Sequence, residues 1–264
     1  MTRIDDTFAG LQGRPALVGF ITAGDPTLAH SVPAMHALVA GGTDLIELGV
    51  PFSDPEAEGP AIQASSERAL ANGMTLAATL DLVAEFRQTN QHTPIVLMGY
   101  LNSILAMPNF AERAGQAGVD GLIMVNLPPE EGTTLRQELA AQNINLIYLV
   151  APTTAPERAE YILKHSGGFV YAVSMKGTTG AGGLDPNAIP DLVRSFKRHT
   201  QLPVCVGFGI RDGATAGAIA AHADGVVVGS AIVQLMAQHE TDVEACATAL
   251  TDFAASLRQG IADR

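Results

Sequence analysis

Short apolar runs rich in β-branched residues recur along the whole chain, and a segment with helical spacing of apolar positions follows each of them. This alternation is typical of parallel strands that are buried on both faces and joined by crossover helices. Eight such runs predict a closed (β/α)8 barrel, the TIM barrel, in which residues 1–264 form a single domain. The expected strands are residues 16–22, 44–49, 95–100, 121–126, 146–150, 169–174, 204–209 and 225–229. The clearest amphipathic helices are residues 80–88, 130–142, 156–165, 186–198 and 214–221.

Smaller features refine this barrel. Residues 3–11 predict an extra N-terminal helix that closes the bottom of the barrel. In the second unit, residues 75–91 follow the short stretch 62–72, which suggests an additional turn or helix there. Asp44, Asp120 and Asp224 each stand just ahead of an even-numbered strand and mark the turn that enters it. An open doubly wound sheet is the alternative, but such sheets usually have five or six strands and often begin on GxGxxG, which this sequence lacks.

Composition and charge limit the class of protein. The chain has 264 residues, 47% of them hydrophobic, which is enough to bury one large core. Asp5 and Asp6 stand where a signal peptide would need apolar residues, and no apolar run approaches the ~18 residues of a membrane span, so we expect a cytoplasmic protein. Cys205 and Cys246 are far apart and offer neither a disulfide framework nor a CxxC metal site. A net charge of −12 argues against nucleic acid or an anionic membrane as partner.

The last two strand ends predict a phosphate site. TIM barrels form their active sites from the loops after the strands, and often bind phosphate in the loops after strands 7 and 8. Gly209 follows the seventh expected strand, and Gly229 and Ser230 follow the eighth. Glycine lets an anion approach backbone N–H groups, and a helix beginning near Ser230 adds about half a positive charge. Each glycine alone could be a tight turn, but together they favour phosphate.

Residues 177–183 have the composition of a lid, with an inert connector as the alternative.

Two carboxylates are candidates for acid–base catalysis. Glu47 interrupts the second expected strand, where an unpaired charge in a dry core would be very costly, so it is expected to face the mouth of the barrel. Burial there would raise its pKa and suit it to proton transfer near neutral pH. A structural ion pair is the alternative, although the neighbouring expected strands contain no arginine or lysine. Glu58, in the Pro- and Gly-rich loop that follows, is the expected second carboxylate, or else a solvated loop charge.

Other chemistries have little support in the sequence. The seven histidines precede strands or lie in or near helices, and no His/Asp/Glu cluster has metal-ligand spacing, so no metal is expected. There is no GxSxG nucleophile elbow. Lys176 is the only lysine near the expected mouth, but a Schiff-base lysine should be buried on a strand rather than in a loop.

Several motifs resemble those of the tryptophan synthase alpha subunit family, in the order of the expected strands and over essentially the whole chain. They are ITAGDP at 21–26, LIELGVPFSDP at 45–55, EGPAIQ at 58–63, LMGYLN at 97–102, KGTTGA at 176–181 and VGFGIRD at 206–212. The resemblance implies a (β/α)8 barrel without a cofactor that cleaves indole-3-glycerol phosphate to indole and glyceraldehyde 3-phosphate. It also implies a pyridoxal-phosphate-dependent beta subunit as partner, in an alpha2-beta2 complex.

The resemblance assigns roles to individual positions. Glu47 matches the general acid and base, and Glu58 the carboxylate that binds the indole N–H. The residues that match the family's phosphate site are Gly180, Gly209, Gly229 and Ser230. The residues that match its face toward the beta subunit are Phe52, Ser53 and Asp54. The expected substrate-binding residues are Phe20, Ile62, Tyr100, Asn126, Tyr171, Thr179 and Phe208. Apolar Ile62, Met98, Leu122 and Phe208 are expected to wall the indole.

The residue chemistry suits this reaction. Breaking the bond between indole C3 and the glycerol chain needs a proton at C3, which Glu47 can supply, and a charge acceptor for the indole N–H, which Glu58 can provide. Ionised Glu47 can then take the hydroxyl proton as the bond breaks.

Four positions depart from the family pattern, namely Glu58 and Asn126 in place of Asp, Glu56 in place of an apolar residue and Thr178 in place of Val.

These departures leave two alternatives open. One is a catalytically weak subunit that mainly activates a beta partner. The other is another phosphosugar-processing barrel, although an isomerase of the triosephosphate type would need a His near strand 4 and a Glu on strand 6, where Asn126 and Ser174 stand.

Overall fold

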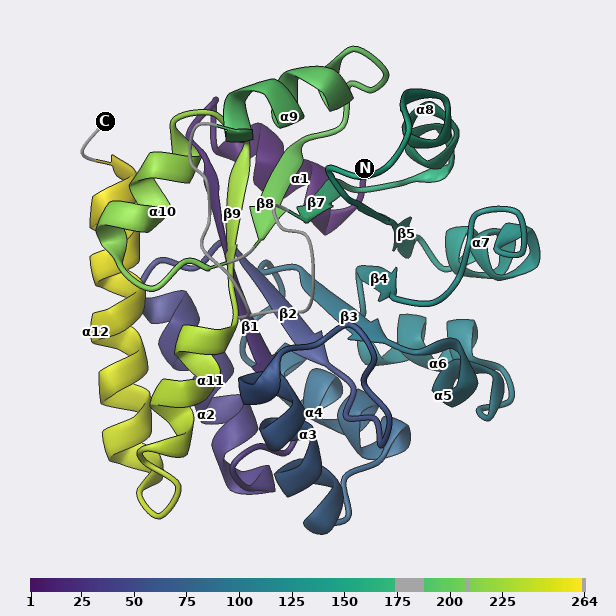
Figure 1. The fold of residues 1–264 in the computed structure, drawn as a ribbon. Helices are drawn as coiled ribbons and strands as arrows, with labels where there is room; N and C mark the ends of the chain where they lie inside the picture. The colour runs from purple at the N-terminus through teal and green to yellow at the C-terminus, as the bar shows by residue number, and fades with distance from the viewer. Residues whose placement is uncertain (174–187, 208, 263–264) are drawn as a thin grey trace.

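The computed structural model describes residues 1–173, 188–207 and 209–262, in which parallel strands form a barrel inside a ring of helices (Figure 1). The strands are β1 (Ala16–Thr22), β2 (Leu45–Gly49), β3 (Ile95–Gly99), β4 (Gly121–Met124), β5 (Asn145–Ile147), β6 (Leu149–Val150), β7 (Val170–Val173), β8 (Val204–Gly207) and β9 (Gly225–Val228). Every registered strand pair is parallel, and both faces of the strands are mostly buried. The predicted (β/α)8 fold is therefore confirmed.

The fifth expected strand, residues 146–150, is divided in two. The hydrogen-bonded order is β5-β4-β3-β2-β1-β9-β8-β7-β6, so β5 and β6 are the two ends of the sheet. They are separated in the chain by Tyr148 alone, and this continuity closes the ring. The expectation of one unbroken strand is wrong because the run changes partner at Tyr148, from β4 on one side to β7 on the other.

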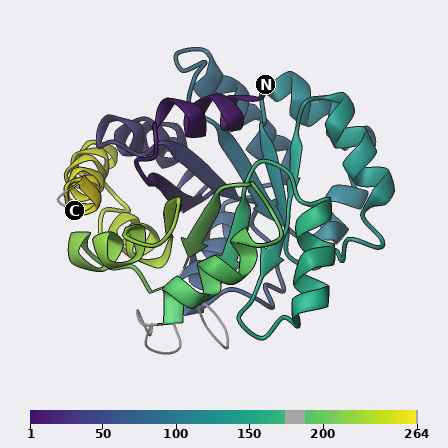
Figure 2. The ribbon, with the colours of Figure 1, turned by 90° about the horizontal axis from the view of Figure 1, so that it is seen from above.

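The helices surround the strands in both views (Figures 1 and 2). They are α1 (Arg3–Gly10), α2 (Leu28–Ala40), α3 (Pro60–Ala71), α4 (Leu76–Arg87), α5 (Leu101–Leu105), α6 (Phe110–Ala117), α7 (Thr133–Ala141), α8 (Pro156–His165), α9 (Ile189–Lys197), α10 (Gly213–Ala220), α11 (Ser230–Ala237) and α12 (Val243–Ala262). The two helices expected in the second unit are α3 and α4. Thr75 caps α4 by accepting a hydrogen bond from the N–H of Ala78 at 3.1 Å, which fixes where that helix begins. None of these helices is long and apolar enough to cross a membrane.

The strands separate two hydrophobic clusters. The larger cluster lies between the outer face of the barrel and the helices, and the smaller one fills the interior of the barrel. Ile4 of α1 belongs to the interior cluster, and Phe8 and Leu11 also pack there, which confirms that the N-terminal helix closes one end of the barrel. Leu122 belongs to the outer cluster, whereas its neighbour Ile123 faces inward. The expectation that Leu122 walls the indole is therefore wrong.

Three aspartates at the bottom of the barrel join neighbouring strands. Each stands just ahead of its own strand, as expected, and its carboxylate also accepts a hydrogen bond from the backbone of the adjacent strand. The bonds run from the N–H of Leu17 to Asp44 at 2.8 Å, of Ile95 to Asp120 at 2.8 Å and of Val204 to Asp224 at 2.6 Å. These bonds help to fix the register of three strand pairs, in addition to marking turns.

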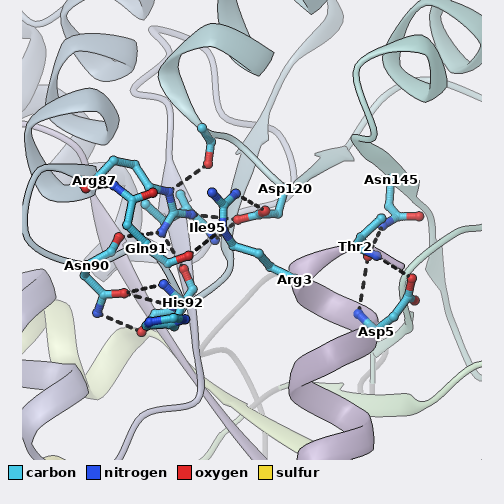
Figure 3. Close-up of polar contacts among 12 residues, drawn as sticks. Thr2, Arg3, Asp5, Arg87, Asn90, Gln91, His92, Ile95, Asp120 and Asn145 are labelled. Atoms are coloured by element: carbon cyan, nitrogen blue, oxygen red, sulfur yellow. Dashed lines mark hydrogen bonds and ion pairs between the residues drawn. The ribbon is translucent and has the colours of Figure 1, made fainter.

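Asp120 is also the centre of a buried charge network (Figure 3). Its Oδ1 lies 2.8 Å from the guanidinium of Arg3 on α1, and its Oδ2 lies 2.7 Å from that of Arg87 on α4. Nearby, Thr2 and Asp5 form a reciprocal capping box that begins α1. The network therefore holds the closing helix against the start of β4.

Candidate active site

Glu47 points into the barrel from the middle of β2. It is in register with Phe20 of β1 and Val96 of β3, and it shares its face of the strand with Leu45, which belongs to the interior cluster. Only 1% of Glu47 is exposed, and its Oε2 has no hydrogen-bond partner among the described residues. A buried carboxylate oxygen without a partner is costly in a core, so it indicates a site built for a ligand or a proton.

Burial controls the protonation state of Glu47. Loss of water and, as the smaller cause, the negative charge of Glu58 together raise the pKa of this carboxyl from 4.5 to about 8. No arginine or lysine of the described ranges is within ion-pair distance of Glu47, which contradicts the alternative of a structural ion pair. At neutral pH Glu47 therefore carries a proton that it can donate.

Glu58 is buried although it lies in a loop. It directly precedes Gly59, the N-cap of α3, and is only 6% exposed, so it is not a solvated loop charge. Burial raises its pKa, while hydrogen bonds from the Tyr100 hydroxyl and from the backbone N–H groups of Glu58 and Ala57 lower it. The two carboxylates interact, because the charge of Glu58 acts on the pKa of Glu47.

Tyr100 contacts a catalytic candidate directly. It follows β3, and its hydroxyl donates a hydrogen bond to Glu58 Oε2 and accepts one from the N–H of Ala57 at 3.1 Å. Sequence reasoning placed Tyr100 among the substrate-binding residues and did not foresee this bond. No local signal indicates it, since residues 58 and 100 belong to different βα units.

Two aromatic rings lie across glycines at the mouth. A Cβ added to Gly49 would lie 2.7 Å from Cζ of Phe20, and one added to Gly207 would lie 2.5 Å from the hydroxyl oxygen of Tyr171. Both distances are shorter than atoms tolerate, so the rings occupy the space that a side chain would need. Burial holds the pKa of Tyr171 well above its ordinary value, which keeps the hydroxyl neutral. These two packing glycines were not recognised from the sequence.

Phe20 and Ile62 form one apolar wall. They pack together with Val233 of α11, and Met98 of β3 packs against the three. Gly229 borders the same wall, because a Cβ there would lie 3.5 Å from Phe20 and 3.7 Å from Ile62. The structure therefore brings together three expected pocket residues, Phe20, Ile62 and Met98, and an expected phosphate residue. Val233 was missed, since an apolar residue on a helix gives no sign that it faces a site.

Two of the expected phosphate residues, Gly229 and Ser230, form the N-terminus of a helix. Gly229 is the N-cap of α11, which begins at Ser230 and has eight residues, so its free N–H groups and dipole favour an anion. Gly209 follows β8 in the left-handed conformation at φ +68°, which favours glycine. Both loops lie at the carboxyl ends of adjacent strands, β8 and β9.

Asn126 has a structural partner. It follows β4, is exposed, and its Oδ1 accepts a hydrogen bond from the N–H of Leu101 at 2.9 Å. This bond ties the end of β4 to the first turn of α5. A contact of Asn126 with substrate stays a prediction.

The expected partner-facing loop is exposed at its tip. Ser53 and Asp54 are exposed and joined by a hydrogen bond of 2.5 Å, whereas Phe52 stacks on Tyr100 with ring centroids 4.7 Å apart. Thr179, Gly180 and Phe208, together with residues 177–183 of the expected lid and Lys176, lie outside the described residues. Among the residues that are described, no group of three His, Cys, Asp or Glu side chains could hold a metal ion.

A buried ion pair near the mouth was also missed. Asp25, in the loop after β1, is fully buried, and its two oxygens lie 2.7 and 3.1 Å from the guanidinium of Arg68 on α3. Burial raises the pKa of Asp25, while Arg68 lowers it. The pair anchors α3, the helix that carries Ile62, to the end of β1.

A (β/α)8 barrel with two buried, interacting carboxylates toward the carboxyl ends of its strands belongs to the class of barrel enzymes that carry out acid–base chemistry. The family model for the tryptophan synthase alpha chain matches residues 8–262. The chain belongs to this family.

Individual relatives agree with the family model. The tryptophan synthase alpha chain of Acidithiobacillus ferrooxidans is 51% identical, over 99% of this chain and 97% of the relative. That of Chromobacterium violaceum is also 51% identical, over 98% of this chain and 100% of the relative. Among solved structures, the alpha chain of Legionella pneumophila has a TM-score of 0.90 at 38% identity, over 100% and 98% of the two chains. Mycobacterium tuberculosis tryptophan synthase has a TM-score of 0.89 at 36% identity, over 98% of each.

The activity follows from the family. The chain is a carbon–carbon lyase that cleaves indole-3-glycerol phosphate in tryptophan biosynthesis, and its family works with a beta subunit. The readings as a mere activator or as another phosphosugar enzyme are not favoured.

Proposed function

We propose that Glu47 is the general acid and then the general base of the lyase reaction, and that Glu58 binds the indole N–H. The observation that carries this proposal is the buried Glu47 carboxyl, whose Oε2 has no hydrogen-bond partner among the described residues and whose pKa is raised to about 8. A proton donor with a pKa near the working pH combines a populated acid form with an easy proton transfer. Among the described residues inside the barrel, Tyr171 and Cys205 have pKa values raised well above their ordinary values, whereas that of Glu47 lies near the working pH.

The reaction then divides between the two carboxylates. Protonated Glu47 gives its proton to indole C3, and the positive charge that develops on the indole nitrogen is stabilised by ionised Glu58, which accepts the N–H hydrogen bond. Glu47, now ionised, takes the proton of the glycerol hydroxyl next to the breaking bond. The electron pair of that O–H bond forms the aldehyde carbonyl, and the carbon–carbon electrons return to the indole ring. Glu47 ends protonated and ready for another turnover.

The remaining assignments concern binding of the substrate. The wall of Phe20 and Ile62, with Tyr171 above Gly207, supports an apolar slot for the planar indole. The N-terminus of α11 at Gly229 and Ser230, with Gly209, supports the phosphate site. Gly180 is assigned to the same phosphate, and Thr179 and Phe208 to the substrate, by their positions in the family motifs alone. Water exclusion by a lid at residues 177–183 would strengthen the hydrogen bonds to both carboxylates.

The complex is proposed to be an alpha2-beta2 heterotetramer in the cytoplasm, with Phe52, Ser53 and Asp54 facing the beta subunit. Two observations favour this face. The loop tip is exposed, and Phe52 of this loop stacks on Tyr100, the N-cap of α5, which lines a groove of about 660 Å³ together with α6 and α7. Leu105 on the rim of that groove is 74% exposed, which is unusual for a large apolar side chain. A single domain is supported by the pairing of β1 with β9, since the first and last strands along the chain are neighbours in one sheet.

The test is release of indole from indole-3-glycerol phosphate by the purified chain, alone and with a beta subunit. We expect Glu58→Ala to lose most of the activity and Glu58→Asp to stay within roughly tenfold of wild type, because a buried methylene is worth only ~0.8 kcal/mol, a factor of about four. Wild-type cleavage by Glu58→Ala would show that another group binds the indole nitrogen. Sedimentation of the mixed subunits gives the stoichiometry, and substitution of Asp54 or Leu105 by arginine should weaken assembly without changing cleavage by the chain alone.

A further inference from the structure

The hydroxyl of Tyr100 has a defined direction. A tyrosine hydroxyl has one proton to donate, and here its oxygen accepts the N–H of Ala57 at 3.1 Å. Its proton is therefore directed to Oε2 of Glu58, the other partner of the same oxygen. Among the described residues, Tyr100 before α5 donates to this carboxylate, and Glu47 on β2 and Tyr171 on β7 interact with its charge.

From this geometry we infer that Tyr100 is a positioning residue, which orients the Glu58 carboxylate toward the substrate and keeps it ionised. The inference rests on the proposed role of Glu58. A glutamate has one more rotatable bond than the aspartate usual in this family, so its carboxylate has more orientations to lose before it can bind the indole N–H. A hydrogen bond to one oxygen of a rigid, planar carboxylate fixes the direction of the other.

The hydroxyl also acts on the charge of Glu58. Burial disfavours the ionised carboxylate, and donation from Tyr100 opposes that effect, because a hydrogen bond to the charged form favours it. Since Glu58 must be ionised to accept the indole N–H, the same bond serves both orientation and charge. Without it, the carboxylate keeps the cost of burial and loses one of the groups that offset it.

The ring of Tyr100 is itself held from two sides. Its backbone is the N-cap of α5, and its ring stacks on Phe52 with centroids 4.7 Å apart and planes inclined by 18°. Tyr100 is 3% exposed, whereas Phe52 belongs to the loop whose tip is exposed at Ser53 and Asp54. The position of the hydroxyl therefore depends in part on the stack with Phe52 of that loop.

The test uses Tyr100→Phe, which removes the hydroxyl and keeps the stacked ring. We expect kcat for indole release to fall by ~10-fold to 100-fold, since a catalytic group misplaced by about 1 Å can cost ~10²-fold. KM should change by less than about threefold, because the walls and the phosphate site are untouched. The acidic limb of the pH profile of kcat should move to higher pH, since Glu58 loses a bond that favours its charged form. The matched control is Tyr148→Phe, which removes a buried hydroxyl that interacts with Arg136 rather than with Glu47 or Glu58, and it should leave kcat, KM and the pH profile unchanged.

Phe52→Leu is the second variant, because it leaves the hydroxyl in place and removes only the stack. It should lower kcat in the same direction as Tyr100→Phe, but less. The inference is overturned if Tyr100→Phe, folded as judged by circular dichroism, keeps the wild-type kcat and acidic limb while Glu58→Ala is inactive. If Glu58→Ala itself cleaves at the wild-type rate, the proposed role of Glu58 fails, and with it the need for a positioning residue. If Tyr100→Phe does not fold, the test rests on Phe52→Leu. The inference is then overturned if Phe52→Leu keeps the wild-type kcat and the acidic limb of its pH profile does not move.

Discussion

The ring of Phe20 lies against the backbone of Gly49, where a Cβ would come within 2.7 Å of the ring. Gly49 is two residues beyond Glu47 on the same face of β2, so the ring occupies the level just above the carboxylate. The absence of a side chain at residue 49 thus gives the pocket its apolar wall directly over the proposed acid.

Substitution Gly49→Ala should therefore displace Phe20 and damage the site. We expect a loss of ~1 to 3 kcal/mol in the free energy of unfolding, the usual cost of overpacking, together with weaker binding of the indole part of the substrate. Urea unfolding and the KM for indole-3-glycerol phosphate measure the two effects. Gly10→Ala is the control, because a Cβ at Gly10 meets nothing within 4 Å. A Gly49→Ala protein with wild-type stability and KM would contradict the proposed wall.

The proposed acid is tested by Glu47→Gln, which keeps the size of the side chain and removes the transferable proton. Less than about a tenth of the wild-type kcat should remain, since general acid–base catalysis contributes ~10² to 10⁴ in rate. In the wild type, kcat should fall as the pH rises through about 8, where Glu47 loses its proton. Retention of substantial cleavage by the variant would assign the proton transfer to a different group.

Glu47 should also make folding stability depend on pH. Its pKa is about 8 in the folded chain and near 4.5 when exposed, so between these values the folded state holds a proton that the unfolded state releases. This stabilising contribution is fully present below pH 4.5 and is lost as the pH rises through about 8. Between pH 5 and 8.5, Glu47→Gln should gain on the order of a few kcal/mol relative to wild type. Urea unfolding of both proteins at several pH values measures this difference, and parallel stability curves would argue against a buried, protonated Glu47.

The phosphate site is tested by Gly229→Val. The backbone of Gly229 is at φ −120°, and a Cβ there would make only ordinary contacts with Phe20 and Ile62, so the chain should fold. The longer side chain would stand where an anion approaches the N-terminus of α11, and affinity for a substrate phosphonate should fall at least tenfold. Gly209→Val is less informative, because its φ of +68° strains any side chain whether or not phosphate binds. Equal phosphonate affinity of Gly229→Val and wild type in calorimetry would place the phosphate elsewhere.

Periodicity alone was sufficient for the barrel. Strands buried on both faces give continuous apolar runs, and eight of them alternating with helices have few other closed arrangements. Glu47 could be selected because a carboxylate inside such a run is an energetic exception that requires a reason. The same continuous apolar runs explain why periodicity did not predict which of Leu122 and Ile123 faces the barrel interior. When both faces are apolar, the sequence does not tell which residue faces the interior.

The sequence by itself determined the fold class, the identity of the candidate acid, and the glycines at the last two strand ends, because each depends on local residue chemistry and spacing. Only the tertiary structure decided which side chains meet across the mouth. Phe20 over Gly49, Tyr171 over Gly207 and Tyr100 against Glu58 each join residues from different strands or loops. Such pairs depend on barrel closure and register, and the break at Tyr148 shows how closure can change the partner of a strand within one residue. These contacts arise from packing in three dimensions, which leaves no period in the chain.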